Sequence, residues 1–276
     1  MNAPRLIINA DDYALTPAVS RGIREAISNG SVTATGIIAN SPHFYRECEY
    51  LHELPGVDIG VHLNLTFWKP LISELSQVFW RSDGYFPGKS WVFSFLLKRD
   101  RTLDLILEEF RAQVRQVQKA GFRILFINSH EHLHMLPWIF PKVLTLADEF
   151  NIPFVRWSTP DKLSFWPVRT MLRDLGLNLS GHLSNKLCLP NSLKLIGFKN
   201  SGKLTYDSVA DSLSCITQNG TYELMCHPGL LDDDKHQLSL LSYHNWVGEL
   251  MLINSKEFSN LLLSRGIQLT RFRDLS

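Results

Sequence analysis

Short apolar runs alternate with longer amphipathic segments along the whole chain. The short runs are rich in branched residues, as in RLIINA (5–10) and RILFINS (123–129), which is typical of buried parallel strands. The longer segments repeat apolar residues at helical spacing. Strands that alternate with helices build a mostly parallel sheet, so the pattern predicts an α/β protein. The expected strands are 5–10, 33–40, 57–65, 123–129, 154–157, 222–227 and 267–272.

Capping residues mark the first expected helix. Thr16 is a good N-cap, Pro17 fits the first helical position, and Asn29-Gly30 fits a helix end. Two stretches follow neither period, and loops of such length inside a compact protein more often face a substrate than lack a role. They are residues 68–101 and 158–203. Further helices are expected over 103–120, 141–150, 207–218 and 246–265.

The bulk composition excludes some classes of partner. The 276 residues match the size of one α/β barrel and contain no repeat or linker, so we expect a single domain over residues 1–276. With 28 basic and 27 acidic residues the formal net charge is +1, and no nucleic-acid partner is expected. The apolar stretch 90–99 is too short to span a bilayer, so no membrane span is expected.

The cysteines and the N-terminal segment indicate a cytoplasmic protein. Cys48, Cys188, Cys215 and Cys226 include no C-x-x-C pair, which fits reduced thiols better than a disulfide framework or a zinc cluster. Residues 1–12 reach two aspartates before an apolar signal segment could form. No signal peptide is therefore expected.

The segment FINSHEHLHMLP (126–137) has three histidines at every second position. From His130 to His134 it also matches the zinc-peptidase pattern H-E-x-x-H. That pattern requires an α-helix, because only a helix places positions i and i+4 on one face. An apolar run precedes the motif and Pro137 follows it closely, so we expect an extended segment with its three histidines on one side. A zinc peptidase is kept as a distant third alternative.

Metal-capable or acid–base groups also mark three other expected strands. Asp11 and Asp12 follow the first strand, His62 lies in the third, and His227 ends the strand 222–227. Taken singly, each has a simpler reading, as an Asx turn or a core histidine. In a parallel barrel, however, all carboxyl ends of strands face one opening, so these groups should converge with His130. One carboxylate and two imidazoles leave room for water and substrate on a metal. The histidines at positions 43, 52, 182, 236 and 244 are expected on the surface or in loops.

Six sequence motifs follow one another in a fixed order. They are NADDYALTPAVSRGI from Asn9, TATGIIAN from Thr33, IGVHLNLT from Ile59 with KPL behind it, NSHEHLHMLP from Asn128, YELMCHPG from Tyr222 and RGIQLTRFRDL from Arg265. Together they resemble the YdjC-like carbohydrate deacetylases. The resemblance implies a single distorted (β/α) barrel related to polysaccharide deacetylases. It also implies a metal-dependent hydrolase that removes an N-acetyl group from an amino sugar or oligosaccharide.

The resemblance assigns roles to individual residues. The ligands of one divalent metal ion, magnesium or zinc, correspond to three side chains. Asp11 resembles the general base, and His227 resembles the acid that protonates the leaving amine. His132 is expected to contact the substrate. The three expected ligands are Asp12, His62 and His130.

Two positions depart from the pattern of the family. Many relatives have aspartate where this chain has Asn128, which removes a negative charge near the expected metal. Tyr13-Ala14 stand where Phe-Gly is usual, and we expect this to change only local packing. Neither departure affects an expected ligand, base or acid.

Aromatic residues between positions 67 and 91 offer a wall for a sugar ring. We expect Trp68 to stack on the substrate, because it lies only six residues after His62. The alternative is a local hydrophobic cluster. The whole set is Phe67, Trp68, Trp80, Tyr85, Phe86 and Trp91.

A sugar-binding or regulatory protein without turnover is the competing function. It would keep the ligands and lose the base or the acid, whereas this chain has both Asp11 and His227. Cys226 beside His227 does not form a thiol dyad, since neighbours on a strand point to opposite faces. The expected partner is therefore an N-acetylated carbohydrate, and a homodimer is left open.

Overall fold

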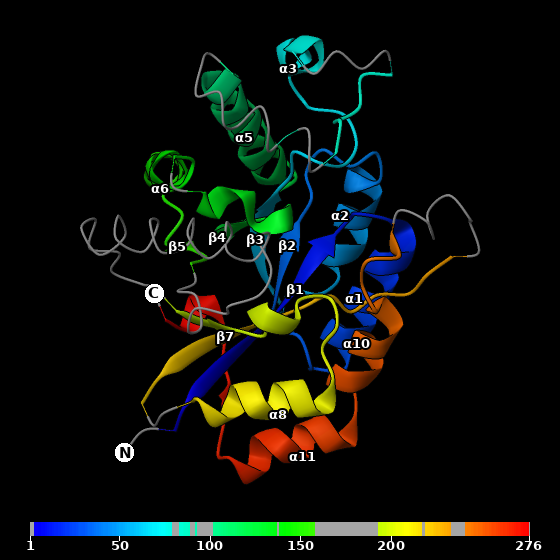
Figure 1. Ribbon diagram of the computed structural model, residues 1–276, viewed down its shortest axis with the longest axis vertical. Coiled ribbons are helices and arrows are strands. Elements are labelled where there is room, and N and C mark those ends of the chain that lie inside the picture. The colour runs from blue at the N-terminus through cyan, green and yellow to red at the C-terminus, as the bar shows by residue number, and fades with distance from the viewer. Residues whose placement is uncertain are drawn as a thin grey trace, which may run out of the picture.

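Seven parallel strands build the sheet of the computed structural model, which describes residues 3–78, 83–88, 92, 102–136, 138–157, 193–216, 219–232 and 241–275. In this part of the chain their order is β5–β4–β3–β2–β1–β7–β6, and the short parallel strand β8 pairs with β1. Figure 1 shows β1 near the middle of the molecule with helices around the sheet. The strands are β1 (Arg5–Tyr13), β2 (Ala34–Ile37), β3 (Asp58–Leu63), β4 (Ile124–Ser129), β5 (Phe154–Val155), β6 (Lys194–Ile196), β7 (Thr221–Cys226) and β8 (Gln268–Leu269).

The sheet is curled into a half-barrel. In the sheet order β5 and β7 are five strand spacings apart, which is about 24 Å in a flat sheet. Nevertheless Arg156, directly after β5, places its Nη2 2.6 Å from Oε1 of Glu223 on β7. Only a strongly curved sheet brings these two side chains together. Within the described residues β5 and β6 pair with no further strand, so the curl does not close there.

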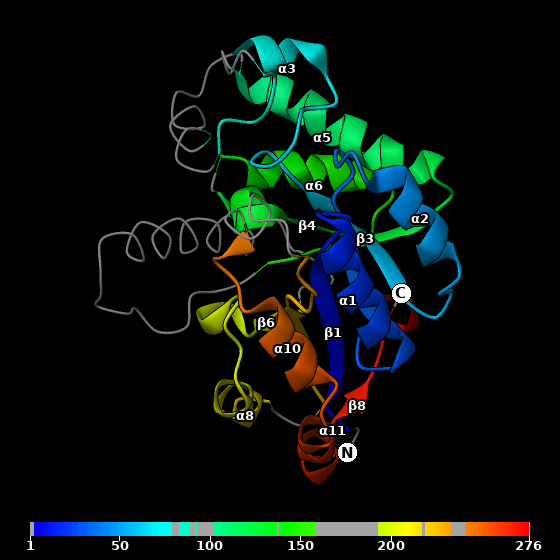
Figure 2. The ribbon, with the colours of Figure 1, turned by 90° about the vertical axis from the view of Figure 1, so that its right-hand side faces the viewer.

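Helices cover the outside of the curled sheet. Helix α1 packs on β1 and on α10, while α5 packs on β3, α3 and α6, and Figure 2 shows α1 running along β1. The helices are α1 (Pro17–Ser28), α2 (Phe44–His52), α3 (Ser73–Val78), α5 (Thr102–Lys119), α6 (Phe140–Glu149), α8 (Tyr206–Ser214), α10 (Trp246–Ile253) and α11 (Lys256–Ser264). Short 3₁₀ segments are η1 (His130–Met135), η2 (Phe198–Asn200) and η3 (Phe272–Asp274).

The two faces of β1 explain where the polar groups go. Leu6 and Ile8 belong to the main core beneath the helices, whereas Ile7 belongs to a separate cluster inside the curl, with Phe126 and Phe154. Because successive side chains alternate, the residues after Ile7 on the inner face are Asn9 and Asp11. The inner face thus changes from apolar to polar toward the carboxyl ends of the strands.

Most of the expected elements are present. The first helix has the predicted cap, since Thr16 Oγ1 accepts a hydrogen bond from the N–H of Val19. The expected helix 246–265 is instead two helices: α10 ends at Ile253 with Asn254 as its C-cap, and Ser255 caps α11 by accepting from the N–H of Phe258. Helices α2 and α3 and strand β6 were not expected. Most of the stretch 158–203, from 158 to 192, lies outside the described residues.

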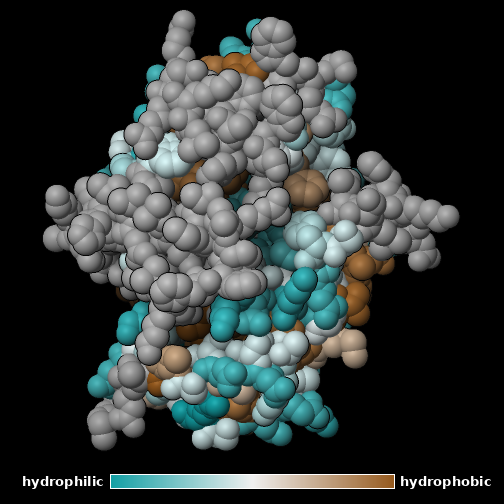
Figure 3. Space-filling model, in the orientation of Figure 1, coloured by the Kyte–Doolittle hydropathy of each residue, from teal (hydrophilic) through white to brown (hydrophobic). Residues whose placement is uncertain are grey.

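On the face seen in Figure 3, hydrophilic and apolar side chains are mixed where Figure 1 shows α8 and α11. Among the described residues, no helix combines the length and the apolar character that a membrane crossing requires.

Candidate metal and catalytic site

Three buried side chains meet at the carboxyl ends of β1, β3 and β4. Oδ1 of Asp12 lies 2.7 Å from His130 Nδ1 and 3.1 Å from His62 Nε2. One donor atom from each residue lies within 4.8 Å of the others. A carboxylate with two imidazoles at this separation could hold a divalent metal ion.

A backbone irregularity allows Asp11 and Asp12 to face the same site. Neighbours on a regular strand point to opposite faces. Between Ala10 and Tyr13 the register of β1 against β2 shifts, and Asp12 has a left-handed φ of 72°. Aspartate tolerates this conformation better than most residues. The sequence motif Asp-Asp therefore serves one site because the strand is distorted there.

Asn128 fixes the ring of His62. Its Nδ2 donates to Asp11 Oδ1 at 2.9 Å, and an ionised carboxylate only accepts, so this contact assigns the orientation of the amide. The amide Oδ1 then faces His62 Nδ1 at 2.7 Å, and this ring nitrogen must carry the proton. His62 Nε2 is left with a lone pair directed at Asp12. An amide at position 128 thus orients one metal-capable histidine and contacts Asp11.

A cation fits the chemistry of this donor set. A lone pair on His62 Nε2 and a carboxylate oxygen of Asp12 repel each other unless a proton or a metal ion lies between them. Asp12 Oδ2 and His130 Nε2 are buried and have no hydrogen-bond partner among the described residues. An unpaired buried polar atom costs about 1–3 kcal/mol. A bound ion would remove this cost.

The charges of the set support the same interpretation. Burial would raise the pKa of the Asp12 carboxyl, but the adjacent His130 and His62 lower that pKa well below its usual value. Burial lowers the pKa of His130, but the carboxylates of Asp12 and Glu131 oppose this. Overall, the pKa of His130 is raised above its usual value. Asp12 therefore stays ionised at neutral pH and offers an anionic oxygen.

Asp11 is held by a buried arginine. Arg156 donates from Nη1 to Asp11 Oδ2 at 2.5 Å and from Nη2 to Oδ1 at 2.9 Å. Burial would raise the pKa of Asp11, but the guanidinium of Arg156, together with His62, lowers that pKa below its usual value. The carboxylate is therefore ionised and fixed in orientation.

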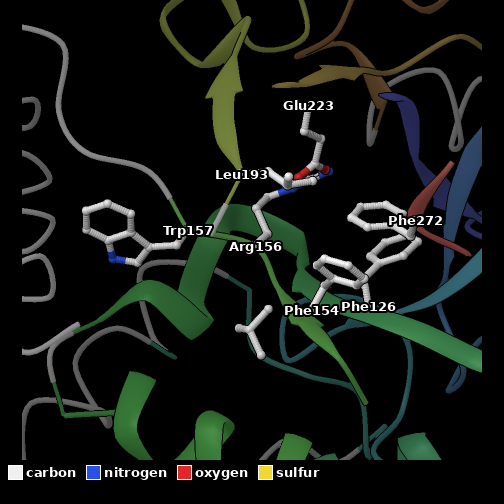
Figure 4. A pocket seen from close by; sticks show the side chains of 8 residues that line it. Phe126, Phe154, Arg156, Trp157, Leu193, Glu223 and Phe272 are labelled. Atoms are coloured by element: carbon white, nitrogen blue, oxygen red, sulfur yellow. Dashed lines mark hydrogen bonds and ion pairs between the residues drawn. The ribbon is translucent and has the colours of Figure 1, made fainter. Parts of the chain in front are cut away.

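Arg156 also connects the edge strand β5 to β7, the strand next to the opposite edge of the curled sheet. Its Nε and Nη2 donate to Glu223 Oε1 at 2.9 and 2.6 Å, and Asn9 donates to the same oxygen at 2.8 Å. Figure 4 shows Arg156 extending toward Glu223, with Phe126 and Phe272 among the rings that line the same pocket. This pocket encloses about 10 Å³, room for roughly one water molecule.

Sequence reasoning gave Arg156 and Glu223 no role. Both lie in short apolar strand sequences, FVRW and YELM, where a charged residue is unusual. Buried charges are rare unless they are paired, so their positions were a usable signal. The signal could indicate a pair, but it could not identify the partners.

His227 lies directly after β7 and faces the site. Its backbone N–H donates to Glu249 Oε2 at 2.6 Å, and its Nδ1 lies 3.7 Å from the same oxygen, beyond ordinary hydrogen-bond distance. Burial lowers the pKa of His227, but Glu249, together with Asp11 and Asp12, opposes this, and the pKa is raised overall. His227 therefore carries a proton more readily than a free histidine. Cys226 before it is buried, and burial raises the pKa of its thiol well above the usual value, which excludes a thiolate.

His244 lies in a loop, as predicted, but its ring reaches the candidate site. Its ring centroid lies 4.1 Å from that of His227, and its donor atom lies within 4.8 Å of both Asp12 and His227. A Cβ at Gly202 would lie 1.6 Å from His244 Nδ1, so the ring rests directly on a glycine backbone. Burial and the neighbouring His227 lower the pKa of His244 to about 2. No strand precedes His244, which is why strand-end reasoning missed it.

The prediction of an extended segment at the H-E-x-x-H match was wrong. Residues His130–Met135 form the 3₁₀ segment η1, in which Glu131 and His132 have left-handed φ values of 57° and 55°. His134 is bound on both sides, with Nδ1 2.6 Å from Ser129 Oγ and Nε2 2.9 Å from the carbonyl of Arg156. Because both its nitrogens are occupied, His134 does not join His130 as a ligand. The geometry therefore rejects the zinc-peptidase alternative.

The two expected substrate contacts, His132 and Trp68, pack against different neighbours. The ring of His132 packs on Phe198 with 4.8 Å between centroids, and its Nδ1 has no partner among the described residues. Trp68 packs against His43 and Tyr85, at 5.6 and 6.4 Å. Neither residue is fully buried.

Within the described part of the expected aromatic set, Phe67 rather than Trp68 contacts a metal candidate. Its ring packs edge-on against the ring of His130, with 5.2 Å between the two ring centroids. Asn64 and Asn40 both donate to the carbonyl of Phe67, which fixes the turn that carries it. Trp80 and Trp91 of the expected aromatic set lie outside the described residues.

Gly36 on β2 leaves the space that the His62–Asn128 pair occupies. A Cβ at this position would lie 2.9 Å from Asn128 Oδ1 and 3.2 Å from His62 Cβ. Both distances are shorter than ordinary van der Waals contact. The central strand therefore carries no side chain at the floor of the site.

Comparisons with known proteins give one family. A family model described as YdjC-like protein matches residues 5–264. Carbohydrate deacetylase 1 of Listeria innocua serovar 6a is 27% identical over 273 residues, which are 98% of this chain and 100% of that protein. The carbohydrate deacetylase of Clostridium beijerinckii is 28% identical, with the same coverage. A crystal structure from Enterococcus faecalis V583, of a protein named for cellobiose-phosphate cleavage, covers both chains fully, with a TM-score of 0.77 and 25% identity.

Proposed function

Because this chain belongs to the YdjC-like family, we propose that it is a carbohydrate deacetylase that uses one divalent metal ion to hydrolyse the N-acetyl group of an amino sugar. The observation that carries the proposal is the set Asp12, His62 and His130, with Asp11 and His227 beside it. Amide hydrolysis needs an activated water, a stabilised oxyanion and a protonated leaving nitrogen. The residues of the site offer a group for each need.

The three ligands would hold the ion through one carboxylate oxygen and two ring nitrogens. When bound, such an ion acidifies water and polarises the acetyl carbonyl. His62 is the ligand best prepared for this, because Asn128 fixes its tautomer. The donor set suits zinc, cobalt or nickel on ligand softness, whereas magnesium is usual for the family, so the metal is left open.

Asp11 would take the proton of the attacking water. Two contacts from Arg156 keep it ionised and hold its plane, so no reorientation is needed at the moment of reaction. The low pKa of Asp11 makes it a weak base by itself. It is adequate here because the water would already be acidified.

His227 would protonate the nitrogen of the leaving amine. An amine anion is too poor a leaving group to depart unaided, so a positioned acid is required. Burial lowers the pKa of His227, but Glu249 is the strongest of the groups that raise it above its usual value, so this ring holds a proton more readily than a free histidine. The proposed reaction requires Asp11 ionised and His227 protonated at its start.

The test is acetate release from N-acetylated sugars by the metal-free protein after each metal is added back. We expect release from an N-acetylglucosamine monomer or oligomer, and none from an acetylated peptide. A matched control is Asp232→Asn, which removes an exposed carboxylate outside the site and should leave the rate unchanged. Absence of acetate release from every N-acetyl sugar, with every divalent metal, would refute the proposal.

Phe67 and Trp68 would form the wall along which the sugar chain lies. Phe67 is next to His130 and would flank the acetylated ring, so Trp68 would meet a neighbouring ring. His132 would offer its unpaired Nδ1 to a hydroxyl group. These assignments fit an apolar wall with few polar contacts.

Trp68→Ala tests this wall. We expect kcat/KM to fall about tenfold for an oligosaccharide, since a stacked aromatic ring contributes about 0.5–1.5 kcal/mol beyond its buried area. For a single N-acetylated sugar the change should be small and the metal content unaltered. Tyr45→Ala is the control, because Tyr45 is 67% exposed on α2. An equal loss on both substrates would return Trp68 to a packing role.

A further inference from the structure

A second set of metal-capable side chains lies beside the first and shares Asp12 with it. Asp12, His227 and His244 each offer one donor atom, and these atoms lie within 4.8 Å of one another. Donor atoms around a tetrahedral zinc ion lie about 3.3 Å apart. Small movements of the side chains would therefore close the set around an ion. Nothing in the proposed hydrolysis requires His244.

Each histidine ring of this second set has a close neighbour on its Nδ1 side. His227 has its Nδ1 on the side of Glu249, 3.7 Å from Oε2, which leaves Nε2 to bind. His244 has its Nδ1 against Gly202, which also leaves its Nε2. Asn245 donates from its backbone to the carbonyl of Gly202 at 2.7 Å and so ties the two segments together.

The two oxygens of Asp12 differ in their contacts. Oδ1 faces His62 and His130, at 3.1 and 2.7 Å. Oδ2 is buried and has no hydrogen-bond partner among the described residues. A carboxylate with one oxygen for each ion can bridge two metals about 3.5–4 Å apart. Asp12 is therefore suited to bind a second ion without releasing the first.

We propose that Asp12, His227 and His244 bind a second divalent ion of the zinc class, and that this ion inhibits the hydrolase. The inhibition rests on the proposed function, in which His227 must deliver a proton. A histidine that binds a metal through Nε2 cannot protonate the leaving amine. Two imidazoles with one carboxylate favour zinc, cobalt and nickel over magnesium. Repulsion between two cations on one carboxylate makes the second ion the weaker one.

Metal stoichiometry tests the site without any assay of turnover. Metal-free full-length protein is dialysed against increasing Zn²⁺ and its zinc content is measured, and the same titration with Co²⁺ is followed by its visible absorption. We expect a second equivalent of zinc in the wild type and only one in His244→Phe, which keeps a ring on Gly202. His244→Gln serves if the phenylalanine variant does not fold. His52→Phe, which removes an exposed histidine elsewhere, should retain the second equivalent.

Two results would overturn the site. One is a single zinc per chain in the wild type at about a hundredfold excess of Zn²⁺ over the first equivalent. The other is a second zinc that persists in His244→Phe and His244→Gln. With Mg²⁺ alone we expect no second equivalent in any variant.

The ratio of turnover in excess zinc to turnover at one equivalent tests the inhibition. In the wild type this ratio should fall at least about tenfold, because acid catalysis typically contributes about 10²–10⁴-fold. In His244→Phe, relative to its own activity at one equivalent, the fall should be much smaller. Equal inhibition in both proteins would overturn the regulatory part. If no N-acetyl sugar is hydrolysed at all, the proposed function fails, while the zinc content still decides the second site.

Discussion

Two groups of buried polar side chains lie next to each other in this protein, and the described structure satisfies only one of them. The paired network consists of Arg156, Asp11, Glu223 and Asn128, and none of these side chains has a buried polar atom without a partner. The open group surrounds the expected metal, and each member has such an atom among the described residues. Its members are Asp12, His130, His132, His227, Tyr243 and His244.

This difference separates what the fold requires from what a ligand requires. Buried polar groups are normally paired, and exceptions need a reason. The paired network joins β1, β4, β7 and the residue after β5, so it holds the curl of the sheet. The open group has buried polar atoms without a partner among the described residues, as expected where a metal and a substrate bind. Mutations in the two groups should therefore have different effects.

The largest expected effect is the loss of metal from the open group. Asp12→Asn keeps the shape of the side chain and tolerates its left-handed φ, but it removes the charge that two histidines surround. We expect the metal content to fall below stoichiometry and turnover to fall more than about a thousandfold, since a metal supplies several kcal/mol of transition-state stabilisation. Stoichiometric metal in this variant, or in the double variant His62→Ala/His130→Ala, would refute the ligand assignment.

The next effect concerns the proposed base and acid. Asp11→Asn and His227→Ala should each keep the metal and lose about 10²–10⁴-fold in turnover. They should alter opposite limbs of the pH profile of kcat/KM, because the base acts when deprotonated and the acid when protonated. Near-normal turnover in either variant would show that its assigned role is wrong.

Removal of the central cation tests the paired network. Arg156→Met leaves Asp11 and Glu223 buried without their shared partner, and breaking a buried ion pair from one side costs about 3–5 kcal/mol. Urea unfolding of the metal-free protein measures this loss. Arg115→Met, at a side chain that is 56% exposed, is the matched control and should change stability by less than about 0.5 kcal/mol. A comparable loss in both variants would contradict the distinction between the two groups.

The smallest effect is a shift of one limb of the pH profile. Glu249 raises the pKa of His227, so replacing it with neutral glutamine should lower that pKa. The acid is active while protonated, and turnover falls as pH rises through its pKa. In Glu249→Gln the alkaline limb of kcat/KM should therefore move to lower pH, with the acid limb unchanged. An unmoved alkaline limb would mean that another group supplies the proton.

Much of the fold and of the candidate site could be predicted from the sequence. Parallel strands place their carboxyl ends on one side, so Asp12, His62, His130 and His227 could be brought together from strand positions alone. What failed was local conformation that depends on the final packing. Nothing in the residue types of Glu131 and His132 indicates left-handed backbone, and the register shift in β1 has no sequence signal either.

The paired network was harder to predict for a different reason. Arg156 and Glu223 come from distant parts of the chain, and they meet only because the sheet curls. Sequence spacing within a strand contains no information about curvature across strands. His244 was missed because a turn, not a strand, brings it to His227. Long-range contacts through loops are therefore where reasoning from periodicity stops.

The missing side chain at position 36 offers a route for engineering. Gly36 lies on β2, which contributes no metal-capable residue, yet a methyl group there would push directly on the amide of Asn128 and on His62. A substitution such as Gly36→Ala would therefore tilt one donor ring while every coordinating residue keeps its identity. A library at position 36 would vary the angle of a single donor in small steps, from a strand that contributes no ligand.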